Sequence, residues 1–221
     1  ALLRSRRDEL TGVLNGLDVT SWNPATDAHI AAPFSADDPQ PRAACRAALL
    51  EALGLPAASD VPLIGVVSRL VGQKGVDLAL DALRRLRERP WHAVILGAGE
   101  PELERAVLEL AAELPGKVRA RIGFDETLAR RIYAGADLLL VPSRYEPCGL
   151  TQMIALRYGC VPVARETGGL ADTVRDLDLS DRPTGVLFPE ASSGSLAFAI
   201  RRAVGAYRRR REWARLQATA L

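Results

Sequence analysis

Two cationic side chains, Arg69 and Lys74, stand together in one short loop that directly follows an apolar run of the sequence. Open α/β sheets bind their ligands at the carboxyl ends of their strands, which is where such a loop would lie. Two fixed cations there can stabilise the negative charge that develops on a diphosphate when its bond to a sugar breaks. Lys74 is one of only two lysines in the chain. The alternative interpretation is a pair of solvated charges in a surface turn.

A carboxylate and a group of backbone donors occur together in a second loop. Glu146 is followed by Cys148 and Gly149, and a helical pattern begins at about Leu150. The backbone N–H groups of Gly149, Leu150 and Thr151 would then lie at a helix N-terminus, where the helix dipole favours an anion. Glu146 beside them can hold a sugar hydroxyl, or it can be a solvated loop charge.

Two further loops after apolar runs carry glycines or an aromatic residue. Gly123 and Phe124 follow one run, and the flat ring of Phe124 is suited to stacking on a nucleotide base, although a packed core side chain is the alternative. Gly168 and Gly169 precede another helical pattern. They can supply a second set of N–H donors or simply form a tight turn.

Three other patterns suggest chemistry but lack the context that it needs. The G-x-G at 97–99 is an incomplete dinucleotide fingerprint, because Glu102 stands where the third glycine is required. The Asp-x-Asp at 176–178 resembles a metal–nucleotide motif, but it follows a helical pattern instead of a strand, and we interpret it as structural. The two histidines, His29 and His92, form no metal-binding or Ser-His-Asp arrangement with other residues.

The elements that must position these loops alternate regularly along the chain. Short apolar runs predict buried parallel strands at 62–68, 92–96, 118–122, 138–141, 161–164 and 185–188. Helical patterns occupy 42–53, 76–88, 101–114, 127–134, 150–158, 170–176 and 194–207, with a basic helix at the end and a charged helical end at 1–10. This alternation over about 130 residues predicts the α/β class, with a doubly wound parallel, Rossmann-like sheet.

The composition excludes several classes of function. The chain of 221 residues is 48 % hydrophobic, which is enough to bury a core in one domain. Its net charge of +2, and the lack of any apolar stretch near the ~20 residues of a membrane span, predict neither a nucleic-acid nor a membrane partner. Cys45, Cys148 and Cys160 show no disulfide or metal-ligand spacing, so we expect no metal, no cofactor and a cytoplasmic protein.

Five stretches, in order along the chain, resemble the bacterial and plant-type glycogen (starch) synthases. They are 12–18 (GVLNGLD), 22–27 (WNPATD), 66–70 (VVSRL) with 73–75 (QKG), 146–152 (EPCGLTQ) and 167–173 (TGGLADT). The resemblance implies a retaining glycosyltransferase of the GT-B fold, of which this chain is the C-terminal half. The implied reaction transfers glucose from ADP-glucose to the non-reducing end of an α-1,4-glucan.

The resemblance also implies a role for each matching residue. Arg69 and Lys74 would neutralise the diphosphate, and they are expected to be catalytic together with Glu146, which would hold the glucosyl ring. The remaining residues are expected to bind the donor: Asn15, Gly123, Phe124, Cys148, Gly149, Leu150, Thr151, Gly168 and Gly169. The position eight residues after Glu146, where many relatives have a ribose-binding glutamate, is Ile154.

The expected domain organisation follows from the same resemblance. The chain begins without a methionine, and residues 21–41 contain four prolines, as an extended linker does. We expect residues 1–40 to be the end of an absent N-terminal domain and an interdomain linker, and residues 41–221 to be the nucleotide-sugar-binding C-terminal domain. The glucan acceptor would bind through the absent domain, so the chain alone is expected to bind ADP or ADP-glucose and to be inactive.

Three alternatives remain open from the sequence. Another retaining GT-B enzyme of the sucrose or trehalose type would use a different donor, such as UDP-glucose, or a different acceptor. A non-catalytic nucleotide-binding or assembly module would have the same loops, but their charged side chains would not take part in a reaction. A dehydrogenase is disfavoured by Glu102.

Overall fold

The fold is a single six-stranded sheet in which all strands run parallel, in the order β3-β2-β1-β4-β5-β6. The computed structural model describes residues 2–13 and 15–221, so Leu14 of the 12–18 stretch and Ala1 lie outside the described residues. The strands are β1 (Leu63–Val67), β2 (His92–Gly97), β3 (Val118–Ile122), β4 (Leu138–Val141), β5 (Val161–Arg165) and β6 (Val186–Phe188). The predicted doubly wound parallel sheet is confirmed.

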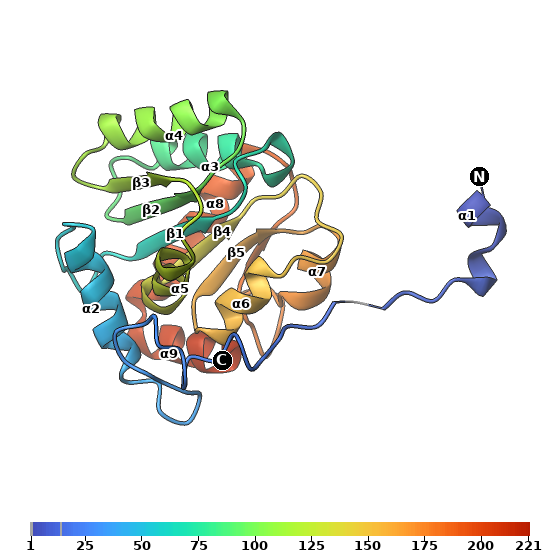
Figure 1. The fold of residues 1–221 in the computed structure, drawn as a ribbon, viewed down its shortest axis with the longest axis horizontal. Coiled ribbons are helices and arrows are strands. Elements are labelled where there is room, and N and C mark those ends of the chain that lie inside the picture. Colours follow the sequence, from blue (N-terminus) through green and yellow to red (C-terminus); the bar gives the residue numbers. More distant parts are fainter. Residues whose placement is uncertain (1, 14) are drawn as a thin grey trace.

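Helices cover both faces of the sheet (Figure 1). On one face lie α3 (Val76–Arg85), α4 (Pro101–Glu113) and α8 (Ser193–Arg208), with α9 (Arg210–Ala220) packed against α8. On the other face lie α2 (Arg42–Ala52), α5 (Glu126–Gly135), α6 (Thr151–Arg157) and α7 (Gly169–Thr173). Two hydrophobic cores result, one on each side of the sheet.

The strand sequences explain why both faces are covered. Side chains of a strand alternate between its two faces. In β1, Leu63 packs with α2 and α5 while its neighbour Ile64 packs on the opposite side with α3 and α8. Both residues are fully buried, so an apolar residue is needed at every position. The helices supply matching apolar stripes, such as Val76, Leu80 and Leu83 of α3.

The strand order places a topological switch point between β1 and β4. The chain winds outward from β1 through β2 to β3, then returns to the other side of β1 and winds through β4, β5 and β6. In sheets of this type, the chain leaves the two strands of the switch point toward opposite faces of the sheet, and ligands bind in a crevice at the carboxyl ends of these strands. The loops that leave β1 and β4 carry Arg69, Lys74 and Glu146.

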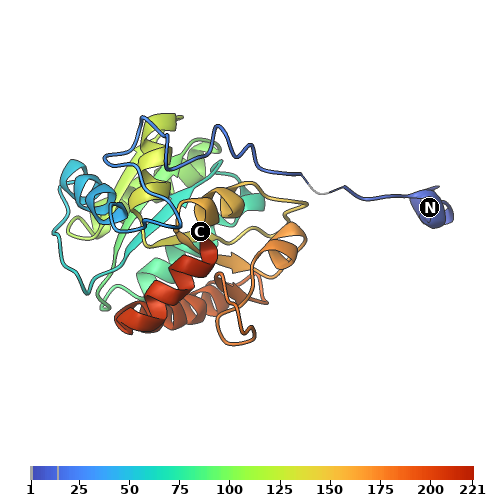
Figure 2. The same cartoon turned by 90° about the horizontal axis from the view of Figure 1, so that it is seen from below.

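Residues 17–41 pack on the body of the domain although they form no helix or strand. They run over α5 and α6 (Figures 1 and 2), and Phe34 is buried against Tyr158. The predicted helical end at 1–10 consists of α1 (Leu2–Ser5) and the 3₁₀ helix η1 (Arg7–Glu9), and α1 lies apart from the sheet in both views.

The predicted strands and helices agree with the structure within a few residues, with one notable difference. The helix expected at 170–176 ends at Thr173, because the backbone at Val174 is extended and Asp176 forms a β-bridge with Gly185. A second 3₁₀ helix, η2 (Gly72–Lys74), shapes the loop after β1. Among the described residues, no helix has both the length and the apolar character that crossing a membrane requires.

Candidate active site

Lys74 and Glu146 meet across the crevice between the β1 and β4 loops. The Lys74 Nζ atom lies 2.5 Å from Glu146 Oε2, and the two side chains are only 18 % and 9 % exposed. The Ser143 hydroxyl donates a hydrogen bond of 2.9 Å to the same carboxylate oxygen. A buried carboxylate needs such partners, because desolvation penalises an unpaired charge. The structure thus joins two of the three expected catalytic residues directly.

The two loops are fixed to each other by a second group of contacts beside this pair. Arg144 makes two hydrogen bonds of 2.7 Å with the Asp77 carboxylate and one of 2.7 Å with the Gly72 carbonyl. The Gln73 amide donates to the Tyr145 carbonyl at 2.9 Å. Hydrogen bonds from Arg144 lower the pKa of Asp77 and outweigh the opposing effect of burial. Lys74 therefore faces Glu146 from a loop of defined position.

The loop that contains Glu146 and Cys148 is packed closely against the turn that begins α7. The Gly169 N–H donates to the Glu146 carbonyl at 3.1 Å. A Cβ atom on Gly168 would stand 2.1 Å from the Glu146 carbonyl oxygen, and one on Gly169 would stand 2.1 Å from that of Cys148. Only glycine permits this approach. Gly169 is buried, and its N–H is engaged within the protein.

Helix α6 begins directly after this loop. Leu150 is its N-cap residue and Thr151 is its first helical residue. Thr151 also faces a pocket of about 340 Å³ that Arg69, Gly123 and Phe124 line from the β1 and β3 loops. Phe124 is 93 % exposed, so it is not a core residue. This pocket lies at the carboxyl ends of the strands and brings together loops that are distant in the sequence.

Asn15 reaches the same region from the N-terminal segment. The Cys148 thiol lies 3.8 Å from the Asn15 carbonyl oxygen, and Asn15 is exposed. All of the site residues expected from the sequence therefore lie at this one edge of the sheet, on its loops or at the first residue of a helix. Ile154, in contrast, is a residue of α6 whose apolar side chain is buried in the core, so it presents no polar group to the site.

The patterns that lacked context have structural roles. Asp176 is buried, accepts a hydrogen bond from the Leu187 N–H at 2.6 Å and pairs with Arg202 at 2.6 Å. Burial acts to raise the pKa of Asp176, but these hydrogen bonds outweigh it and the pKa is lowered. The turn at 97–99 packs under the β1 loop, since a Cβ atom on Gly99 would lie 2.1 Å from the Leu70 carbonyl oxygen.

His92, at the start of β2, is also structural. Its side chain is buried and its pKa is lowered, first by burial and then by nearby cations of which Lys117 has the largest effect. Within residues 2–13 and 15–221, no group of three or more His, Cys, Asp or Glu side chains is placed to hold a metal ion.

Four residues at the site are not among those expected from the sequence. They are Ser143, Arg144, Asp77 and Gln152. A single Ser, Arg or Asp carries no specific signal by itself, and Arg144 and Asp77 are 67 positions apart in the chain. Gln152 belongs to the EPCGLTQ stretch, so that motif was the one signal that could have included it.

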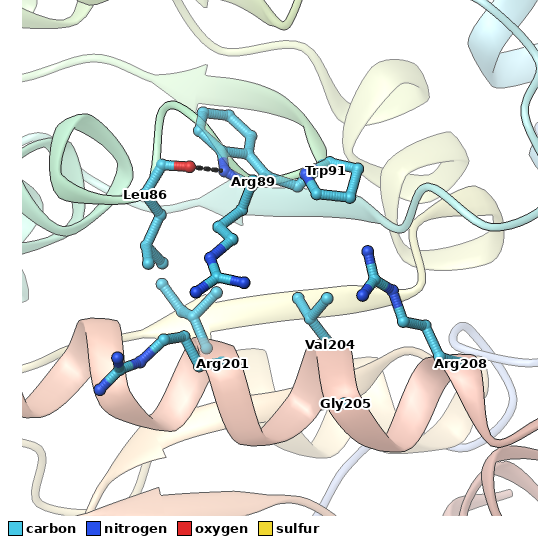
Figure 3. Close-up of a pocket in the computed structure, with 9 residues that line it drawn as sticks. Leu86, Arg89, Trp91, Arg201, Val204, Gly205 and Arg208 are labelled. Atoms are coloured by element: carbon cyan, nitrogen blue, oxygen red, sulfur yellow. Dashed lines mark hydrogen bonds between the residues drawn. The ribbon is translucent and has the colours of Figure 1, made fainter.

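A second pocket, of about 230 Å³, lies between the end of α3 and α8 (Figure 3). Trp91 forms part of an apolar wall of this pocket. Its indole N–H donates to the Leu86 carbonyl at 2.7 Å. Arg89, Arg201 and Arg208 surround it. It lies near the amino ends of the strands, and no expected site residue lines it.

Comparison with known protein families identifies the family of this chain. Residues 54–216 match the family model of the glycosyl transferases group 1, so the chain belongs to this family. Its relatives in this family include glycogen synthases. The glycogen synthase of Anaeromyxobacter sp. (strain Fw109-5) is 53 % identical over 213 residues, which are 96 % of this chain and 45 % of that protein. That of Alkalilimnicola ehrlichii is 49 % identical over 226 residues, or 100 % of this chain and 46 % of that protein.

A solved structure agrees with these sequence comparisons. The catalytic domain of starch synthase IV from Arabidopsis thaliana, bound to ADP and acarbose, superposes with a TM-score of 0.94 and 39 % identity. The match covers 99 % of this chain and 46 % of that one. The chain thus spans about half the length of the relatives that it matches.

Proposed function

We propose that this chain is the donor-binding half of a glycogen synthase. The whole enzyme would transfer glucose from ADP-glucose to the non-reducing end of an α-1,4-glucan and retain the anomeric configuration. The observation that carries the proposal is the buried contact of 2.5 Å between Lys74 and Glu146 at the β1/β4 switch point. It places a cation for the leaving diphosphate next to a carboxylate suited to sugar hydroxyls.

The remaining site residues take complementary roles in this proposal. Arg69 and Lys74 neutralise the diphosphate, the Glu146 carboxylate and the backbone of Cys148 and Gly149 hold the glucosyl ring, and Leu150 and Thr151 donate N–H groups to the phosphate. Gly123 and Phe124 contact the adenine, and Phe124 is exposed as a stacking ring requires. The acceptor hydroxyl would attack from the same face as the departing diphosphate, on a sugar with oxocarbenium-like charge.

The glucan acceptor belongs to the other half of the enzyme in this proposal. The chain spans about half the length of its relatives, and Asn15, which we propose faces the donor, lies at the edge of the crevice beside Cys148. We therefore expect the isolated chain to bind ADP without extending glucan. The proposal places the enzyme in the reducing cytoplasm, where Cys45, Cys148 and Cys160 remain free thiols.

The first test is calorimetric titration of the chain with ADP, UDP and NAD, each with and without Mg²⁺. We expect ADP to bind more tightly than UDP, without a requirement for Mg²⁺, and NAD not to bind. Replacing Lys74 by alanine should weaken ADP binding by roughly 10- to 100-fold, as expected for a charge-assisted contact to phosphate. Arg105→Ala, which removes an exposed cation of α4, is the matched control and should bind as the parent does.

Each alternative has its own outcome in this experiment. Preference for UDP would favour a sucrose- or trehalose-type enzyme, and NAD binding would favour a dehydrogenase. ADP affinity that is equal in the parent and in Lys74→Ala would favour a non-catalytic nucleotide-binding module. Extension of glucan by the isolated chain would contradict the assignment of the acceptor surface to the other half.

A further inference from the structure

Gln152 is a fully buried polar side chain directly behind the loop that holds Glu146. It lies in the first turn of α6 and is 0 % exposed. Its Nε2 atom donates to the carbonyl oxygens of Cys148 at 3.0 Å and Gly149 at 2.8 Å, and contacts the Thr173 hydroxyl at 3.1 Å. One amide group therefore holds two consecutive peptide units of the loop.

Holding those two carbonyl groups fixes the direction of the neighbouring N–H groups. In a planar trans peptide, the C=O of one residue and the N–H of the next point in opposite directions. Since the Cys148 and Gly149 carbonyls point inward to Gln152, the N–H groups of Gly149 and Leu150 must point outward. Among the described residues, neither of these N–H groups has a hydrogen-bond acceptor within the protein.

The backbone at Gly149 supports the same geometry. Gly149 has φ of +75°, a conformation that other residues rarely adopt. A Cβ atom there would lie 2.3 Å from Gln152 Oε1, so the amide group sits directly against the turn. Gln152 Oε1 has no hydrogen-bond partner among the described residues. The side chain is thus held by its NH₂ group alone. Its buried, unpaired Oε1 atom has a desolvation cost that an apolar residue would avoid.

We propose that Gln152 is a positioning residue that turns the Leu150 N–H toward the donor diphosphate and the Gly149 N–H toward the glucosyl unit beside it. This inference rests on the proposed function, because it assumes that a diphosphate binds at this loop. Gln152 touches no ligand itself. Its NH₂ group aligns the donors before the anion arrives, so that binding does not require the loop to reorganise.

The direct test replaces Gln152 by methionine, which has similar length but cannot donate. ADP affinity is measured by calorimetry and adenosine affinity by ligand-observed NMR. We expect ADP binding to weaken by roughly 10- to 100-fold, the range for one or two hydrogen bonds to a charged group, and adenosine binding to change little. Gln217→Met is the matched control, because Gln217 Nε2 also donates to a backbone carbonyl, that of Gly159 at 2.9 Å, far from the crevice.

A second variant protects the test against a loss of folding in Gln152→Met. Gln152→Glu keeps the shape of the side chain but has one donor when protonated and none when ionised. Relative to the parent at each pH, its ADP affinity should therefore rise as the pH is lowered from 8 to 5. A side chain that merely fills space would give no such pH dependence.

The outcomes separate this inference from the proposed function. If the parent chain does not bind ADP, the proposed function fails first. If ADP binds and Lys74→Ala weakens it, but Gln152→Met and Gln152→Glu bind ADP as the parent does, only the role of Gln152 is refuted. Equal losses of ADP and adenosine affinity in both Gln152 variants would also refute it, because the effect would then not depend on phosphate.

Discussion

Lys74 and Glu146 form an ion pair that is mostly removed from water, with Ser143 as a third partner. Removing either charge alone leaves the other one buried without compensation, whereas removing both does not. In the proposed reaction a diphosphate would approach the same lysine. The ion pair therefore holds Lys74 in position in the crevice. In the proposed complex, the diphosphate would lie on the Lys74 side of this contact and the sugar on the Glu146 side.

This pair predicts a strong coupling in stability. Lys74→Met should lower the free energy of unfolding by about 2–4 kcal/mol, because the Glu146 carboxylate loses its cation in a site of low exposure. The double variant Lys74→Met, Glu146→Gln should recover most of that loss. Urea unfolding of the parent, both single variants and the double variant measures the coupling. Additive effects would show that the two charges are independent.

At the scale of elements, side chains that look functional in the sequence can serve to join helices and strands. Asp176 connects the chain after α7 to β6 through the Leu187 N–H and to α8 through Arg202. The Asp176 side chain is 5 % exposed. Its position after a helix, on the side away from the crevice loops, fits a role in packing.

Asp176→Asn should therefore destabilise the fold, by about 2–4 kcal/mol, and leave ADP affinity unchanged. Because the pKa of Asp176 is lowered from its ordinary value of 3.8, its charge stabilises the folded state above that value. This contribution is lost as the pH falls through the lowered pKa. Thermal unfolding followed between pH 7 and pH 3 should show that the variant loses less stability on acidification than the parent does. A large fall in ADP affinity would instead support a role in binding.

At the scale of the whole molecule, the N-terminal segment is attached to the domain by a compact polar and aromatic cluster. Arg130 of α5 contacts Asp27 at 3.1 Å and lies 4.3 Å from the Trp22 ring centre. The Tyr158 hydroxyl donates to Asp27 at 2.5 Å. Burial acts to raise the pKa of Asp27, but hydrogen bonds from Tyr158, the His29 N–H and Arg130 outweigh it and lower the pKa. The segment is therefore held in a defined path up to the crevice.

Arg130→Met should release this segment without disturbing the sheet. The Asp27 side chain is 1 % exposed and would lose its cation, so we expect faster amide hydrogen exchange in residues 19–30. Exchange in β1 and β2 should remain as slow as in the parent. Hydrogen exchange followed by mass spectrometry resolves both regions. Equal acceleration in β1 and β2 would mean that the cluster supports the whole domain.

The domain boundary at residue 40, between the expected linker and the C-terminal domain, stays a prediction.

Patterns in the sequence predicted most of the fold, and the residues that they selected for the candidate site lie at one edge of the sheet. Continuous apolar runs predicted the strands because a parallel strand buries both of its faces. The helix expected at 170–176 was too long, since the bridge between Asp176 and Gly185 is a contact that helical periodicity cannot reveal. Arg144 and Asp77 were not expected at the site, because two partly exposed charges that are 67 positions apart give no local signal of pairing.

The alternation of strands and helices and the chemical nature of each loop depend on residues that are close together in the chain, so both could be predicted from the sequence. Which loops meet depends on the tertiary structure. Lys74 and Glu146 are separated by 72 positions, and they touch because β1 and β4 are neighbours at the switch point of the sheet. The inward direction of the Cys148 and Gly149 carbonyls likewise depends on the packing of α6 behind them, since it is set by Gln152.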